Sequence, residues 1–364
     1  MEIVGTNLFA YPSGRLGPVT LFVAGRSWTV DDAVAFAAFR GELRPAVAEA
    51  IALAAAEEEA DEEGLIIDDE RLQAASEKFR YEHDLISAGE TEEWLSTRRM
   101  TTEDFGHWLY QRLCREAASA GPPLPRFPDL PDDFGDLLRV HLWLSGEMDR
   151  ISELLARRIA AGRELDSGQQ TERARAVIDS FLERERIDRR ALPEWLAAIG
   201  RDEGWLDEIA RLEAAYERIS SSAISDDTRR RKLAALERSL STLEFDLLEL
   251  DSAGAAREAL LCVQDDSIPL AEVARDAGFK AVRSEACLED LGPLGERLSA
   301  APEGAVVGPI ESEGRFRLYH LIRKQKPSLS DPEVLRRIDT MILDELFEGL
   351  TARHVESQKA AASI

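Results

Sequence analysis

The sequence has little of what builds disulfide frameworks and metal sites. Its 364 residues include three cysteines, Cys114, Cys262 and Cys287, and five histidines. No two cysteines form a CxxC pair, and no histidines have HExxH spacing. An odd, sparse set of cysteines argues against a disulfide scaffold and against a zinc site. GxGxxG, Walker A and GxSxG motifs are also absent. We therefore expect no metal and no cofactor, and we interpret the histidines as surface or helix-cap residues.

Long apolar runs are missing as well. No stretch approaches the roughly 20 apolar residues that a membrane helix needs. The first residues, MEIVGTNLFAYPSG, have neither the basic segment nor the long apolar segment of a signal peptide. We expect a cytoplasmic protein with no membrane partner. A leader removed before this sequence begins is an alternative that stays open.

Basic residues are in deficit. There are 45 Lys and Arg against 70 Asp and Glu, which gives a net charge of −25. Such a chain repels phosphate backbones, so we expect no nucleic-acid partner. A cationic or apolar peptide suits this charge better. Residues 269–286, PLAEVARDAGFKAVRSEA, resemble the first half of a helix-turn-helix, but the charge and the β-rich continuation argue against DNA binding.

The arrangement of prolines and periodic segments divides the chain. Residues 1–30 read as an arm or short strands, and 31–120 as a helical module with apolar residues at helical spacing. Residues 121–131, GPPLPRFPDLP, hold five of the fifteen prolines, which predicts a stiff linker and a domain boundary. A second helical module follows over 132–235. We expect a compact α+β domain over 236–330, then a C-terminal helix and tail over 331–364.

The two helical modules share a pattern. Phe79 opens FRYEHDLISAGETEEWL and Phe181 opens FLERERIDRRALPEWL, and in both segments a Glu-Trp-Leu triplet follows. The Phe pair is 102 residues apart, and the pair Trp94 and Trp195 is 101 apart. Each triplet precedes a helix that has an aromatic residue near its start, Phe105 or Trp205. This pattern predicts a duplicated helical module, although any two pairs of amphipathic helices share some such features.

The predicted α+β domain is similar to a known one. It reads as a strand near 242–250, two helices, and two strands within EGAVVGPIESEGRFRLYHLIRKQ, residues 303–325. The segments EGAVVGPI and GRFRLYHLI resemble the end of a parvulin-type (PpiC-like) prolyl isomerase domain, and IPLAEVARDAG resembles its FxELAxxYS segment. Residues 64–109 resemble the helical domain of SurA-like chaperones, and 327–355 resemble their returning C-terminal helix. The layout is similar to a family of PpiC-related putative peptide maturation proteins.

The resemblance implies a set of functional positions. Parvulins use two histidines, a Cys or Asp beside the substrate, and an apolar proline pocket. Where the first strand has its histidine, this chain has Phe245 or Asp246. The last-strand histidine position falls on Arg317, three residues before His320, which therefore points to the opposite face of a strand.

The remaining positions are better preserved in character than in identity. If the domain is active, His320 and Cys287 are the catalytic candidates, although Cys287 also reads as a small buried apolar residue. The apolar pocket falls on Leu291, Leu294 and Leu298, which have the spacing of a helix face packed in a core as well. We add Phe316, Trp94 and Trp195 as candidate peptide-binding residues, the two tryptophans as part of an apolar groove between the helical modules.

These observations favour a mostly α-helical protein with a small α+β domain, in which SurA-like helical modules accompany a degenerate parvulin-like domain. We expect a chaperone-like binder of a precursor peptide or unfolded polypeptide, acting in peptide maturation, with a maturation enzyme as a second expected partner. One alternative is an active prolyl cis-trans isomerase. A second is a structural subunit of a peptide-modifying complex.

Overall fold

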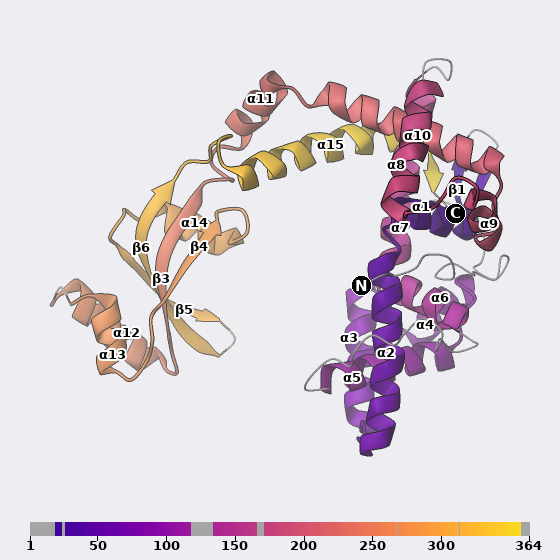
Figure 1. The fold of residues 1–364 in the computed structure, drawn as a ribbon. Coiled ribbons are helices and arrows are strands. Elements are labelled where there is room, and N and C mark those ends of the chain that lie inside the picture. Colours follow the sequence, from indigo (N-terminus) through magenta and orange to yellow (C-terminus); the bar gives the residue numbers. More distant parts are fainter. Residues whose placement is uncertain are drawn as a thin grey trace. The chain divides into compact units, whose positions relative to one another are not determined.

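The structure is a computed structural model that describes residues 19–23, 26–117, 134–165, 171–266, 268–312 and 314–357. Contacts divide the chain into two compact units. The helical unit consists of Met1–Ser220 and Phe347–Ile364, and the α+β unit consists of Ser221–Leu346. The expected fold class, mostly α with a small α+β domain, is confirmed (Figure 1). No helix in the described ranges is long and apolar enough to cross a membrane.

The helical unit begins with two strands, β1 (Val19–Val23) and β2 (Arg26–Thr29), which pair with the short strand β7 (Glu356–Ser357) in the order β2-β1-β7. Its helices are α1 (Val30–Arg40), α2 (Arg44–Glu63), α3 (Asp69–Glu82), α4 (Ala88–Thr97), α5 (Thr102–Ala117), α6 (Phe134–Leu144), α7 (Glu147–Glu164), α8 (Thr171–Glu185), α9 (Leu192–Ala198) and α10 (Glu203–Ala223). The last turn of α10 belongs to the second unit.

The helix ends follow local sequence signals. Thr29 and Asp32 form a capping box at the start of α1, and Ser87 and Glu90 form one at the start of α4. Gly41 ends α1 in a left-handed conformation (φ 75°), which glycine adopts without steric cost. These short polar motifs fix where each helix begins and ends.

The two expected helical modules share one core. The largest buried cluster joins α1 and α2 from the first segment with α6 to α10 from the second, through residues such as Phe36, Leu142, Ile151 and Ile209. A second cluster joins α3, α4 and α5 to Val140 and Leu144 of α6. The compact units therefore differ from the expected division at the proline-rich segment. That segment, 121–131, lies outside the described residues.

The backbone supports the predicted duplication. Asp84 after α3 and Arg186 after α8 both have positive φ, 55° and 54°. The residues that follow them, Leu85 and Ile187, end the two helices with equivalent hydrogen bonds. The Leu85 N–H donates to the Arg80 carbonyl (2.8 Å), and the Ile187 N–H donates to the Leu182 carbonyl (2.9 Å).

The next two helices agree in the same way. Thr101 accepts a hydrogen bond from the Asp104 amide (3.1 Å) at the start of α5, as Asp202 does from the Trp205 amide (2.8 Å) at the start of α10. These features agree with the predicted duplication, which pairs α1 to α5 (the first repeat) with α6 to α10 (the second repeat). Trp205 corresponds to Asp104, and the counterpart of Phe105 is Leu206, one residue further on than the sequence pattern indicates.

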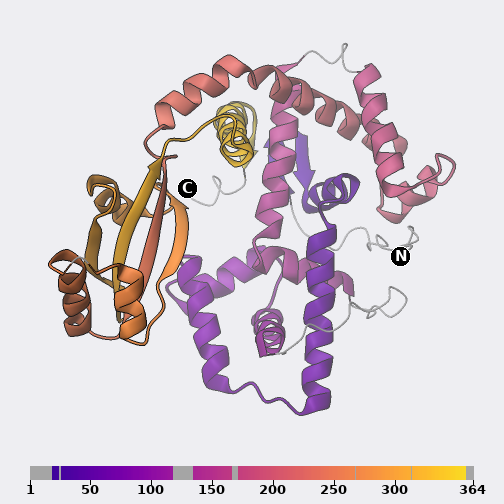
Figure 2. The same cartoon turned by 60° about the vertical axis from the view of Figure 1, so that its left-hand side comes forward.

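The α+β unit is built on a four-stranded antiparallel sheet with the strand order β4-β3-β6-β5. Its elements are α11 (Asp226–Leu236), β3 (Thr242–Leu250), α12 (Ala253–Gln264), α13 (Leu270–Asp276), β4 (Val282–Cys287), α14 (Gly292–Ala300), β5 (Val306–Ser312) and β6 (Arg315–Gln325). They can be followed in Figure 2. The element order matches the strand-helix-helix-strand-strand order expected from the sequence, with β4 and α14 added between them.

The C-terminal helix α15 (Pro332–His354) has residues in both units. Within the α+β unit, Arg229 donates two hydrogen bonds to Asp339 (2.7 and 2.8 Å). Within the helical unit, Phe347 is fully buried and stacks on Tyr216 with ring centroids 4.6 Å apart. Near its end, His354 pairs with Glu164 (2.9 Å).

Candidate functional site

The two faces of the four-stranded sheet carry different side chains. Because side chains alternate along a strand, Leu243, Phe245 and Leu247 of β3 lie on one face, and Leu248 and Leu250 lie on the other. Helix α14 covers the first face and helices α12 and α13 cover the second. We call these the α14 face and the α12 face.

The α14 face has an apolar side chain, Phe245, at the first-strand position where the parvulin resemblance expects a histidine. Phe245 and Tyr319 are buried there, with ring centroids 5.5 Å apart in an edge-to-face arrangement. Leu298 is fully buried beside them, and Leu291 and Leu294 are half-buried against the same cluster. The structure therefore brings the three predicted pocket leucines together.

His320 lies on the opposite side of the sheet. It pairs with Asp246 in the β3–β6 register, and its Nδ1 is 3.8 Å from the Asp246 carboxylate. Arg283 donates two hydrogen bonds to the same carboxylate, at 2.9 and 3.1 Å. These charge-assisted bonds raise the pKa of Arg283. His320 thus belongs to an ion-pair group on the α12 face.

Cys287 is not near His320. Cys287 pairs with Thr242 and His320 with Asp246, four residues along β3, which is about 13 Å at the rise of a strand. The Cys287 thiol donates to the Ser239 carbonyl at 3.2 Å.

Arg317, at the expected last-strand histidine position, pairs with Glu249 (2.6 Å), and this hydrogen bond raises the pKa of Arg317. His320, Cys287 and Arg317, the expected catalytic positions, therefore do not lie together as one proton-transfer group.

The other predicted peptide-binding residues lie apart. Phe316 is half-buried against the cluster on the α12 face, away from the pocket leucines. Trp195 is 4% exposed and packs edge-to-face on Phe181, 4.8 Å between ring centroids, so its ring is not available at the surface. Trp94 is half-buried under the Arg98 guanidinium, which lies 3.9 Å from the ring centroid. Trp94 and Trp195 belong to different core clusters and line no common groove.

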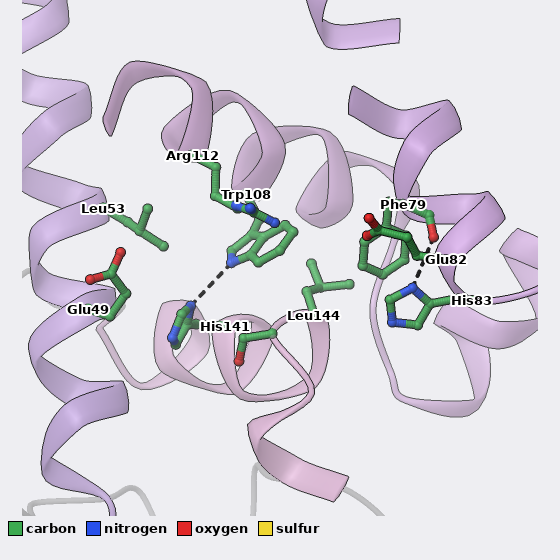
Figure 3. A pocket seen from close by; sticks show the side chains of 10 residues that line it. Glu49, Leu53, Phe79, Glu82, His83, Trp108, Arg112, His141 and Leu144 are labelled. Atoms are coloured by element: carbon green, nitrogen blue, oxygen red, sulfur yellow. Dashed lines mark hydrogen bonds between the residues drawn. The ribbon is translucent and has the colours of Figure 1, made fainter. Parts of the chain in front are cut away.

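A pocket of about 360 Å³ opens in the helical unit (Figure 3). Its apolar wall consists of Leu53 from α2, Phe79 from α3, Trp108 from α5 and Leu144 from α6. Polar side chains from the same four helices and the turn after α6 complete its lining: Glu49, Glu82, His83, Arg112, His141 and Ser145. Sequence reasoning missed this pocket, although one of its lining residues, Phe79, stood out in the repeat pattern.

Two histidines of the pocket have defined partners. His83 stacks on Phe79, with ring centroids 4.0 Å apart, and its Nδ1 is 2.9 Å from the Phe79 carbonyl. His141 is 5% exposed, which corrects the expectation that it is a surface or cap residue. Its Nδ1 accepts the indole N–H of Trp108 at 3.3 Å (Figure 3). Burial lowers the pKa of His141, although Glu49 and Glu147 act in the opposite direction.

The described residues contain no group of three or more His, Cys, Asp or Glu side chains that could hold a metal ion. The three cysteines are free thiols, and burial raises the pKa of Cys114.

Comparisons with known proteins gave matches among solved structures. No protein-family model matches the chain, and no curated protein matches its sequence. The foldase protein PrsA from Streptococcus pneumoniae is 13% identical, covers 60% of this chain and 86% of its own length, and has a TM-score of 0.27. PrsA from Lactococcus lactis is 13% identical over 65% of this chain and 88% of its own, with a TM-score of 0.26. A SurA-like chaperone from Campylobacter jejuni is 13% identical over 59% of this chain and 86% of its own, with a TM-score of 0.19. The chain is similar to these foldase and chaperone structures.

Proposed function

We propose that this protein is a chaperone-like polypeptide binder whose parvulin-like domain holds its substrate without catalysis. The observation that carries this proposal is the distribution of side chains over the sheet. The α14 face carries Phe245, Tyr319 and the three leucines, whereas His320 lies on the other face and Cys287 lies about 13 Å further along β3.

The chemistry of prolyl isomerisation explains why this distribution matters. The barrier to rotation about the peptide bond is about 18–20 kcal/mol. Enzymes lower such barriers with polar groups placed where charge changes in the transition state. An apolar face can still bind an apolar segment, because burial of apolar surface contributes about 25 cal/mol per Å². The half-buried Leu291 and Leu294 of the α14 face can contact such a segment, whereas Arg317, at the expected last-strand histidine position, is already paired with Glu249.

The substrate we propose is a precursor peptide or an unfolded polypeptide, bound during maturation of the peptide. The net charge of −25 favours apolar or cationic segments over acidic ones. The maturation role rests on the family resemblance of the sequence.

The test is NMR exchange spectroscopy on an Xaa-Pro peptide with substoichiometric protein, observing the peptide. We expect shifted or broadened peptide signals at an unchanged rate of cis/trans exchange. Faster exchange would show that the domain is an isomerase. Leu294→Glu should reduce the broadening, because it places a charge on the α14 face. Leu261→Glu, at a leucine that is 54% exposed on α12, is the matched control and should not.

A further inference from the structure

We propose that the pocket of the helical unit binds one aromatic side chain of a polypeptide, and that it is the unfilled counterpart of a site beside α8 that phenylalanines of α1 fill. This site is separate from the α14 face, and the inference does not depend on the function proposed for that face.

The pocket residues have counterparts in the second repeat. Aligning Gly41 with Gly146, which end α1 and precede α7 with φ of 75° and 80°, places Phe36, Phe39 and Arg40 opposite His141, Leu144 and Ser145. The same alignment pairs buried positions in the following helices, such as Leu43 with Met148 and Ala50 with Leu155. The duplicated helix ends place Phe79 opposite Phe181 and Glu82 opposite Arg184.

Beside α8 the corresponding space is filled by side chains of α1. Phe39 packs on Phe181 with ring centroids 4.7 Å apart, and both rings are about fully buried, at 2% and 1% exposure. Arg184 donates a hydrogen bond to the Phe39 carbonyl. Phe36 is fully buried near the guanidinium of Arg158, which is 5.8 Å from its ring centroid. The site beside α8 therefore holds the aromatic side chain of Phe39 and the backbone carbonyl of the same residue.

Beside α3 each of these occupants is smaller. On α6, histidine stands where α1 has Phe36, leucine where it has Phe39 and serine where it has Arg40, at positions 141, 144 and 145. Phe79 keeps the aromatic wall that Phe181 provides, and Trp108 stands where α10 has Ile209. A space of about 360 Å³ lies between these side chains. A cavity of about 150 Å³ lined by apolar side chains is enough to bind benzene, so this one has room for an aromatic ring.

The pocket also offers a donor for a peptide carbonyl. An indole N–H can only donate, so Nδ1 of His141 is the acceptor, and the neutral ring carries its proton on Nε2. This Nε2–H belongs to a side chain that lines the pocket (Figure 3). It can serve the bound residue as Arg184 serves the Phe39 carbonyl in the second repeat.

The surface beside the pocket is suited to an incoming chain. Tyr81, within the same turn of α3 as Glu82, is 80% exposed, and Ile86 after that helix is 82% exposed. Arg80 holds the segment after the helix through hydrogen bonds to the carbonyls of Leu85 (3.3 Å) and Ile86 (2.7 Å). Apolar groups exposed next to a pocket are typical of surfaces that bind other chains.

The probe is the capped hexapeptide Ala-Ala-Phe-Arg-Gly-Glu, which copies residues 37–42, the segment that fills the site beside α8. Binding to the full chain is followed by the indole N–H signal of Trp108, assigned with Trp108→Phe. We expect a saturable shift with this peptide and at least about tenfold weaker binding when its phenylalanine is alanine. No saturable shift, or equal affinity for both peptides, would overturn the proposal.

Two variants locate the binding. Leu144→Phe introduces the side chain that α1 has at the equivalent position, Phe39, and should abolish binding while the far-ultraviolet circular dichroism stays unchanged. The Ser145→Cys variant is folded first and then blocked with benzyl methanethiosulfonate, so this test does not depend on how the core repacks. The blocked protein should lose binding. The unblocked variant and the reagent-treated wild type should keep it. Leu261→Phe is the size-matched control on an exposed site. Wild-type affinity in both Leu144→Phe and the blocked Ser145→Cys would contradict the assignment.

Discussion

The indole N–H of Trp108 donates to Nδ1 of His141 across a distance of 3.3 Å, between helices α5 and α6. Both side chains are buried, at 3% and 5% exposure. The bond requires the neutral form of His141, because a protonated imidazole has two donors and no acceptor. Packing between the two helices is therefore linked to the protonation of one buried ring.

This link predicts how stability depends on pH. Burial lowers the pKa of His141 below its unfolded value of about 6.5. Between the two pKa values the unfolded chain binds a proton that the folded chain does not, so the free energy of unfolding rises with pH there. The stabilising contribution is present above about pH 6.5 and is lost as the pH falls below it. Glu49 and Glu147 oppose this shift, and Arg112 reinforces it.

Urea denaturation at pH 5.5 and 7.5 measures the effect. His141→Gln should show a smaller difference in the free energy of unfolding between the two pH values than the wild type does. Trp108→Phe keeps a buried imidazole and should keep most of the difference. An unchanged difference in His141→Gln would show that the ring is not the source.

A buried ion pair yields a second prediction. Glu213 on α10 is 5% exposed and accepts from Arg158 on α7 at 3.1 Å and from Arg40 on α1. Removing one member of a buried pair leaves the other charge without compensation, at a cost of about 3–5 kcal/mol. Glu213→Leu should lower the free energy of unfolding by that amount. Glu153→Gln, which removes an exposed partner of Arg157, should change it by less than about 1 kcal/mol. Similar losses in both variants would contradict the assigned role of burial.

The fold class followed from local signals that the structure retains. The strand near 242–250 is β3, Thr242–Leu250, and α1 begins at a capping box formed by Thr29 and Asp32. Alternation along β6 correctly separated Arg317 from His320, because successive strand residues point to opposite faces. Such features depend only on neighbours in the sequence.

Features that depend on distant segments were harder to predict. Helix α1 packs on α7 and on the core of the second repeat, so the modules share a core that no sequence boundary reveals. His141 is buried because α6 packs on α2 and α5, and nothing in the sequence around it indicates this. Trp195 is buried by Phe181 and its neighbours, although tryptophans at surfaces and in cores have the same sequence pattern.

The duplicated tryptophans give a third prediction. Trp195 is 4% exposed in the main core, whereas Trp94 is half-buried and covered by Arg98. Trp195→Ala should lower the free energy of unfolding by about 3–5 kcal/mol, as a large-to-small change in a core does. Trp94→Ala should cost clearly less, because part of its ring already faces solvent. Denaturation of both variants under one condition tests the ranking, and an equal or reversed order would contradict it.

The last prediction concerns His320 and Cys287, which an active isomerase would need. His320 is half-exposed beside the Asp246–Arg283 pair, and exposed ion pairs contribute about 0–1 kcal/mol. We expect His320→Ala and Cys287→Ala to leave the NMR broadening of an Xaa-Pro peptide, and its rate of cis/trans exchange, as in the wild type. Tyr319→Ala removes a buried ring from the α14 face and should weaken the broadening, so it shows that the assay responds to that face. A change of exchange rate in His320→Ala or Cys287→Ala would assign these side chains a catalytic role, and it would require the two to approach one another across the four residues, about 13 Å along β3, that separate their partners.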